Sequence, residues 1–366
     1  MTGTTPILGG GATNAELSLR AGAKVRTVRT LTELDRIEPL WARLAGNPVA
    51  SFAYRRAWAA GLEEGRQLSV LVAPGSESPA IAPLVVNQGG AGWLTLLAAE
   101  MYEILDFLYG DEAALGALVR AVAGTGRPLF LQRFPADSPA VEAIQSAYRG
   151  RGAVLKRAAR GAPYIPLDPS WAEPETHLNP GRRSDLRRAR RTAEKIGRVE
   201  IEILTPDPAR VPSLVEEAFR VEAAGWKGAK GSALTADPVR GPFFLRYAQA
   251  AAEQGILRMC FLRIGGLAAA AQIAVDSGAQ FSLLRAGYDE EFSRCSPGML
   301  LTVESIRYAA RRALRSYEFN GEVEPWTEVW TRQERPCCSI RVYPFRPRGL
   351  AALAGDGWRM LAGKVR

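Results

Sequence analysis

Three consecutive apolar runs, separated by short glycine-containing breaks, constrain the fold more than any other feature of this sequence. The runs cover residues 256–264, 267–275 and 280–288, and the breaks contain Gly265-Gly266 and Ser277-Gly278. Short breaks of this composition favour hairpin connections between neighbouring strands. The segment therefore predicts an antiparallel meander.

A long helix and a further strand are predicted directly after the meander, at residues 297–314 and 316–320. Apolar residues recur along the helix at spacings of three and four, so one of its faces should pack against a sheet. They are Leu300, Val303, Ile306, Ala310 and Ala313.

The start of that helix is typical of an anion-binding site. Ser296 is a suitable N-cap, Pro297 suits the first helical position, and Gly298 leaves the backbone accessible. We therefore predict outward-facing N–H groups at Gly298, Met299 and Leu300, and such groups bind phosphate. The alternative interpretation is that Ser-Pro-Gly only begins a helix.

The order of elements recurs in the two halves of the chain. The second half reads as a basic helix 184–196, a strand 199–204, helices 211–224 and 242–254, the meander, a helix and a strand. The first half reads as a strand 25–30, helices 31–45 and 53–63, β-rich runs 67–73 and 80–86, a helix 113–123, a strand 128–134, a helix 139–148 and a strand 153–156. This order predicts a structural duplication.

Length supports two lobes, because 366 residues exceed what most single cores hold. We predict a flexible leader (1–23), a first lobe (24–165), a second lobe (166–348) and a terminal helix (349–366) with Leu350, Leu353, Trp358 and Leu361 inward. No signal-peptide pattern and no apolar run long enough for a membrane span is seen, so we expect a soluble cytoplasmic protein without a membrane span.

Histidine is almost absent, and this limits the chemistry. His177 is the single histidine, and the four cysteines show no CxxC spacing. Ser-His and Cys-His relays and zinc sites therefore lack their residues, and we expect no metal site. Any general base must be a carboxylate or water.

Several short motifs carry a resemblance to a known family. Residues 171–330 resemble the CelD/BcsL-type acyltransferases associated with cellulose and exopolysaccharide synthesis, a GNAT branch related to the Fem peptidoglycan transferases. The matching residues are Arg183-Ser184-Asp185-Leu186-Arg187-Arg188, Gly225-Trp226-Lys227-Gly228, Tyr288-Asp289-Glu290, Ser296-Pro297-Gly298 and Tyr317-Glu318-Phe319-Asn320-Gly321. The first half matches more weakly, at Phe52 with Trp58, at Ala82-Pro83-Leu84, and around Tyr102 and Asp106.

The resemblance implies an α/β fold of two tandem GNAT-like lobes, with mixed, mostly antiparallel sheets flanked by helices. It also implies acetyl-CoA or another acyl-CoA as co-substrate, with no cofactor bound permanently. The implied donor-binding residues are Arg294, Ser296, Gly298, Met299 and Leu300. The usual GNAT phosphate loop, Arg/Gln-x-x-Gly-x-Gly/Ala, is only partly present, since Arg294 to Met299 contains one glycine, shifted by one place.

Carboxylates at two strand ends are the candidate bases for amine acylation. Asp289 and Glu290 end one strand, while Glu318 and Glu322 flank the end of the next, and Tyr288 is a candidate proton donor to the leaving thiolate. The simpler interpretation makes the carboxylates solvated loop residues and Tyr288 a core aromatic. Candidate substrate-binding residues are Trp226, Lys227, Arg183, Arg187 and Asn320.

The basic helix has three interpretations. Its arginines are a solvated surface, a site for an acidic ligand such as the CoA phosphates, or an RNA-binding surface.

Taken together, these features predict an acyl-CoA-dependent N-acyltransferase acting by direct transfer on an amine of a sugar, amino acid or natural-product intermediate. The alternatives are a Fem-like transferase using aminoacyl-tRNA and a non-catalytic ligand-binding protein on the same fold.

Overall fold

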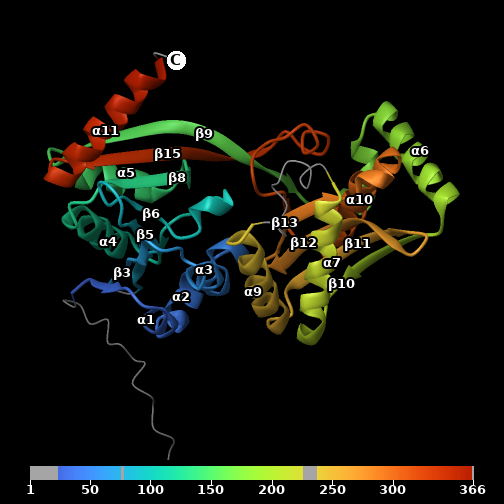
Figure 1. Cartoon of the computed structure of the whole chain (residues 1–366), viewed down its shortest axis with the longest axis horizontal. Coiled ribbons are helices and arrows are strands. Elements are labelled where there is room, and N and C mark those ends of the chain that lie inside the picture. Colours follow the sequence, from blue (N-terminus) through green and yellow to red (C-terminus); the bar gives the residue numbers. More distant parts are fainter. Residues whose placement is uncertain (1–23, 76–77, 226–236, 365–366) are drawn as a thin grey trace, which may run out of the picture.

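Two lobes lie side by side and share one continuous sheet (Figure 1). The computed structural model describes residues 24–75, 78–225 and 237–364. Two long strands, β9 (Gly152–Pro166) and β15 (Glu334–Pro344), run from the first lobe toward the second. The architecture is mixed α/β with helices flanking a large mixed sheet, as predicted.

The meander of the second lobe forms as predicted. It consists of β10 (Val199–Leu204), β11 (Leu257–Ile264), β12 (Leu267–Ser277) and β13 (Gln280–Tyr288), each antiparallel to the next. Gly265 and Gly266 form the first tight turn at φ 60° and 86°, a conformation that glycine adopts without steric cost.

Helices cover both faces of this meander. Met259 and Phe261 of β11 pack on the side of α7 (Val211–Ala223) and α9 (Arg240–Glu253). The alternating residues Cys260 and Leu262 face the opposite core, which contains α10 (Pro297–Arg311) and α6 (Pro180–Ile196). The period of two along β11 therefore places a separate core on each side of the sheet.

The first lobe keeps the predicted order of elements, but each predicted β-rich run is divided into two strands, and two short strands between residues 94 and 109 were not predicted. Its helices are α1 (Leu31–Asp35), α2 (Glu38–Leu44), α3 (Phe52–Ala59), α4 (Glu112–Gly124) and α5 (Pro139–Ala147), and its strands are β1 (Arg26–Val28), β2 (Arg66–Leu68), β3 (Val70–Ala73), β4 (Ala80–Ala82), β5 (Leu84–Asn87), β6 (Leu94–Leu96), β7 (Leu108–Tyr109) and β8 (Leu129–Pro135). The single helix expected at 31–45 is two helices, because a new one begins at Glu38 with Pro39 in its first turn.

Strand pairing shows the duplication. In each lobe one neighbouring pair is parallel: β6 with β8, and β13 with β14 (Ser316–Glu318). The large sheet runs in the order β10-β11-β12-β13-β14-β9-β15-β8-β6-β5-β2. Residues 334–344, which the sequence order assigns to the second lobe, thus lie between two strands of the first.

The terminal helix α11 (Pro347–Lys364) packs with a different face from the predicted one. Leu350, Leu353 and Trp358 are exposed, while Ala352 and Asp356 are buried. The expectation of an inward apolar face is wrong for these three residues, because Asp356 binds Tyr343 and Arg341 of β15 and so fixes the helix rotation. Side chains beyond residue 360, including that of Leu361, are not described. Within the described residues, no helix combines the length and apolarity needed to cross a membrane.

Candidate functional site

The parallel strands β13 and β14 separate after a short paired stretch. Their pairing ends at Ser282 and Glu318. Just beyond, Nδ2 of Asn320 donates a hydrogen bond to the carbonyl of Leu283 at 3.2 Å. We call this divergence the fork, and a pocket of about 920 Å³ opens from it.

An irregularity in β13 shapes the wall of this pocket. Ile273 and Ala274 of β12 pair with Arg285 and Leu283, so Leu284 is an extra residue in β13. Such a bulge bends a strand and re-aims its side chains. Residues 283–288 all line the pocket.

The N-terminus of α10 lies at the same pocket, through Ser296, Gly298 and Met299. Ser296 occupies the N-cap in the left-handed conformation (φ 45°, ψ 51°), and its side chain makes no capping bond. Its carbonyl instead accepts from the N–H groups of Met299 (3.0 Å) and Leu300 (3.2 Å). The expectation of three outward N–H groups is therefore wrong for these two. The positive end of the helix dipole still faces the pocket.

A polar chain connects this helix with the floor of the pocket. Gln272 of β12 donates from Nε2 to Oγ1 of Thr302 at 3.1 Å, and Thr302 donates to the carbonyl of Gly298 at 2.8 Å. Gln272 is 2% exposed, and its Oε1 has no hydrogen-bond partner among the described residues. The floor thus offers an acceptor to a ligand N–H group.

The first lobe contributes a wall that the sequence analysis largely missed. Between β6 and β7, the short 3-10 helix Ala99–Met101 is flanked by Ala98 and Tyr102, both in the left-handed conformation. Figure 1 shows this segment extending from the first lobe toward the second. Residues 100–103 line the pocket, so the site is built from both lobes.

Glu103 has the most perturbed carboxyl group of the pocket. It is 5% exposed, and burial raises its pKa to about 8, although the Arg133 charge and the Gly321 N–H act in the opposite direction. A buried, perturbed carboxyl in a pocket is a candidate functional group. The only sequence sign was the weak resemblance around Tyr102 and Asp106.

Residues 180–328 match the model of the family described as acetyltransferase (GNAT) domain. This segment is similar to GNAT acetyltransferase domains. It contains the meander, the fork and the start of α10. A search of curated protein sequences finds no match for the chain.

Solved structures share the fold over nearly the whole chain. One is the C-terminal DUF2156 domain of a putative lysylphosphatidylglycerol synthetase from Agrobacterium fabrum, with 14% identity, a TM-score of 0.56, and coverage of 90% of this chain and 96% of that one. Another is a conserved protein of unknown function from Bacteroides thetaiotaomicron, with 12% identity, a TM-score of 0.54, and coverage of 87% and 98%. A third, L-PGS from Bacillus licheniformis, has 12% identity, a TM-score of 0.50, and coverage of 91% and 97%. At these identities the likeness shows the fold alone.

Within the matched segment, two of the five predicted catalytic residues line the pocket. They are Tyr288 and Glu322. Burial and the neighbouring Glu290 raise the pKa of Tyr288. Glu322 lies 3.8 Å from Nη1 of Arg133 and 3.4 Å from Nη1 of Arg160.

The other three predicted catalytic residues do not line the pocket. Asp289 accepts from the N–H of Glu291 at 3.0 Å and begins a 3-10 turn, and Glu290 is exposed. Glu318 is buried and accepts from Arg335 at 2.9 and 2.5 Å and from Ser316 at 2.6 Å. These bonds give Glu318 a structural partner on β15.

The predicted binding residues are also divided. Ser296, Gly298, Met299 and Asn320 line the pocket at the fork. Leu300 is on the opposite face of α10, in a hollow of about 310 Å³ that Arg183 and Arg187 also line. Arg294 is exposed before the helix. Trp226 and Lys227 lie outside the described residues.

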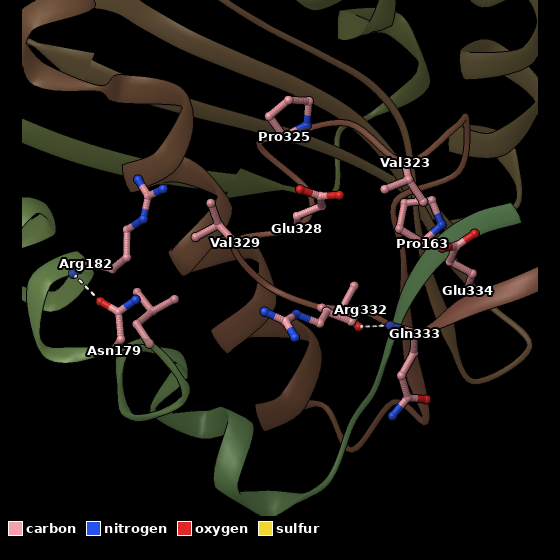
Figure 2. A pocket seen from close by; sticks show the side chains of 12 residues that line it. Pro163, Asn179, Arg182, Val323, Pro325, Glu328, Val329, Arg332, Gln333 and Glu334 are labelled. Atoms are coloured by element: carbon pink, nitrogen blue, oxygen red, sulfur yellow. Dashed lines mark hydrogen bonds between the residues drawn. The ribbon is translucent and has the colours of Figure 1, made fainter. Parts of the chain in front are cut away.

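A second pocket, of about 490 Å³, lies between the start of α6 and residues 323–334. Figure 2 shows Glu328 and Arg332 pointing into it and Arg182 beside it. These charged groups are solvent-exposed. The fork pocket, with its strand divergence, helix N-terminus and buried carboxyl, is therefore the stronger candidate site.

Proposed function

We propose that this protein is an acyl-CoA-dependent N-acyltransferase that transfers an acetyl or other acyl group directly to an amine. The supporting observation is the fork beside the N-terminus of α10. An extended thioester arm fits between diverging strands, where backbone groups can bond to it, and the helix dipole favours its phosphates. We further propose that the protein belongs to the CelD/BcsL-type branch.

The residues present fit such a donor. The volume of the pocket, about 920 Å³, is typical of small-molecule sites. Oε1 of Gln272 would accept from an amide N–H of the arm, while the helix start at Gly298 would face the phosphates. Bound acyl-CoA supplies a thioester that is activated toward amines.

Tyr288 is the proposed proton donor to the departing sulfur. Its raised pKa, caused by burial and by Glu290, keeps the phenol protonated at neutral pH. The proton on its hydroxyl is then ready for a thiolate in the same pocket.

A second candidate, aminoacyl transfer from charged tRNA, is favoured by one observation. The helix α6 exposes Arg182, Arg187, Arg188 and Arg191 at the outer end of the second lobe (Figure 1). Clustered arginines suit an RNA backbone, and their binding to it is sensitive to salt.

A cytoplasmic location remains part of the proposal, since the four cysteines are all unpaired.

The test is isothermal titration of the full chain with acetyl-CoA, longer acyl-CoAs and free CoA. We compare wild type with Gly298→Asp, which puts a carboxylate where phosphate should lie. The matched control is Gly298→Ala, because a Cβ there meets Tyr288 Cδ1 at 3.5 Å, an ordinary contact. We expect Gly298→Asp to weaken binding by roughly tenfold or more and Gly298→Ala to keep it.

Absence of heat with every CoA species would reject the CoA donor. Salt-sensitive binding of tRNA, lost when Arg187 and Arg188 are replaced by Gln, would then support the second candidate. Absence of both would leave the ligand-binding alternative.

A further inference from the structure

Three acceptor atoms in the fork pocket are buried without a donor. They are Oε2 of Glu100, Oε2 of Glu103 and Oε1 of Gln272, and none has a hydrogen-bond partner among the described residues. Buried acceptors without donors are rare, because each loses its bonds to water without compensation. With Oε1 of Gln272 assigned to the donor arm, the two carboxyl oxygens point to a second ligand that carries N–H donors.

The first lobe holds the Glu100 carboxylate firmly. Oε1 of Glu100 is bound by Nη1 of Arg66 at 2.5 Å, and the Glu100 carbonyl accepts from Nη2 of Arg240 at 3.4 Å. Ala98 and Tyr102 are left-handed, a conformation that costs free energy in residues other than glycine and often occurs at functional sites. The free oxygen of Glu100 therefore has a fixed position.

Among the described residues, no cation is bonded to Glu103. Arg133, which favours its charged form, is 3% exposed and donates to the carbonyls of Arg160 and Gly321. Nε of Arg133 has no hydrogen-bond partner among the described residues, so no hydrogen bond joins it to Glu103. The Glu103 carboxyl thus remains available to a ligand, and a bound ammonium group would favour its charged form.

The charges lining the pocket favour a cation. Five carboxylates line it, against two arginines. The arginines already have partners: Nε of Arg285 lies 2.7 Å from Glu222, and Nε of Arg240 lies 3.7 Å from Asp237. Glu100 is paired with Arg66, and Glu322 lies near Arg133 and Arg160. Among the described residues, the carboxyl groups of Glu103, on the first-lobe side, and Glu324, on the second, are left without an ion pair.

We infer that Glu100 and Glu103 form the acceptor site, which binds the primary ammonium group of the amine substrate, and that Glu103 takes the proton that makes this amine nucleophilic. This inference rests on the proposed N-acyltransferase function and adds the charge class of the acceptor and the identity of the base.

The proton balance follows directly. The ammonium gives one proton to the Glu103 carboxylate, and the free amine attacks the thioester carbonyl carbon. A C–N bond forms and the C–S bond breaks. The second proton lost by nitrogen ends on sulfur as the thiol, by way of Tyr288, and Glu103 releases the first to solvent. Amide, free CoA and one proton are the products.

The test measures binding of simple probes by the full chain. The probes are 1-aminobutane and 1,5-diaminopentane, with 1-butanol and 1,5-pentanediol as uncharged counterparts, titrated in the presence and absence of acetyl-CoA. We expect the amines to bind and the alcohols not to. Glu100→Gln and Glu103→Gln should each weaken amine binding by about tenfold or more, since each removes a bond to a charged group.

Glu328→Gln is the matched control, because it removes the same charge from an exposed residue of the second pocket. Melting temperatures verify that each variant is folded. Alcohols binding as well as amines, unchanged amine affinity in Glu103→Gln, or no amine binding at millimolar concentration would each overturn the inference.

The two proposals fail in different ways. Binding of acetyl-CoA without binding of amines rejects the acceptor site and leaves the donor proposal intact. Binding of amines without any CoA rejects the donor proposal alone. Mutual exclusion of acetyl-CoA and amine would assign the ammonium to an aminoacyl donor and overturn the acceptor site.

Discussion

Asn320 and Leu283 are joined by a side-chain-to-backbone hydrogen bond of 3.2 Å that bridges two strands just where their pairing ends. Asn320 holds this position in the left-handed conformation, at φ 55°. Its amide thus takes the place of the next ladder bond and limits how far the fork opens.

Substitution of Asn320 should separate the hydrogen bond from the backbone conformation. Asn320→Gly loses only the hydrogen bond, which should lower the free energy of unfolding by about 1 kcal/mol. Asn320→Ala loses the same bond and also destabilises the left-handed conformation, which should lower it by roughly 1 kcal/mol more. Urea denaturation of both variants measures the difference. Equal stability of the two would show that the backbone relaxes.

Glu318 should behave as a structural residue. It accepts from Arg335 and Ser316 while 6% exposed, and the pair joins β14 to β15. We expect Glu318→Gln to lower the free energy of unfolding by about 2 kcal/mol, since Arg335 is itself partly exposed, and to leave donor affinity unchanged. Titration with acetyl-CoA at a temperature where the variant is folded checks this. A selective loss of turnover with normal stability would instead favour catalysis.

Asp356 should make the docking of α11 sensitive to acid. Burial raises its pKa, but bonds from Tyr343, Arg359 and Arg341 outweigh burial and hold the pKa below 3.8. The contribution of Asp356 is therefore present above pH 3.8 and lost as pH falls through the lower value in the folded state. Asp356→Asn should cost roughly 2 kcal/mol at neutral pH and progressively less in acid. Denaturation curves across this pH range measure whether the stabilities of wild type and Asp356→Asn converge.

Glu103 should show the opposite dependence on pH. The pKa is about 8 in the folded protein against 4.5 for an ordinary glutamate, chiefly through burial. Below pH 4.5 the carboxyl is protonated in both the folded and the unfolded protein, so it does not change the free energy of unfolding. Between pH 4.5 and 8 it ionises in the unfolded chain only, and this progressively lowers the free energy of unfolding.

Glu103→Gln removes this dependence, so its stability advantage over wild type should grow with pH across that window. Arg133, Tyr54 and Tyr247 interact electrostatically with Glu103 or lie beside it, and Arg133→Gln should raise its pKa further. An advantage that is flat from pH 5 to 8 would contradict the raised pKa. Saturation with an ammonium ligand should reduce the advantage.

Local patterns predicted the second lobe well. The meander follows from apolar runs and from glycines that adopt positive φ at the turns, and these signals lie within a few residues of one another. Each of these features depends on neighbours in sequence.

Features that depend on distant contacts were missed. Glu103 enters the pocket of the other lobe because the segment after β6 leaves its sheet, and the local sequence does not indicate this path. The rotation of α11 depends on the hydrogen bond between Asp356 and Tyr343, so the apolar pattern of the helix predicted the wrong buried face. Ser296 was expected to cap the helix through its side chain. Instead, its backbone is left-handed, its side chain makes no capping bond, and its carbonyl accepts from the N–H groups of Met299 and Leu300.

The position of β15 has a consequence for the order in which the molecule forms. During synthesis, β8 and β9 emerge long before residues 334–344, which later fill the gap between them. Until then β8 has one open edge and β9 lacks both of its neighbours, and open strand edges are prone to pair with other chains. Final closure of its sheet therefore waits for nearly the whole polypeptide, and the two lobes cannot be separated or exchanged as independent modules.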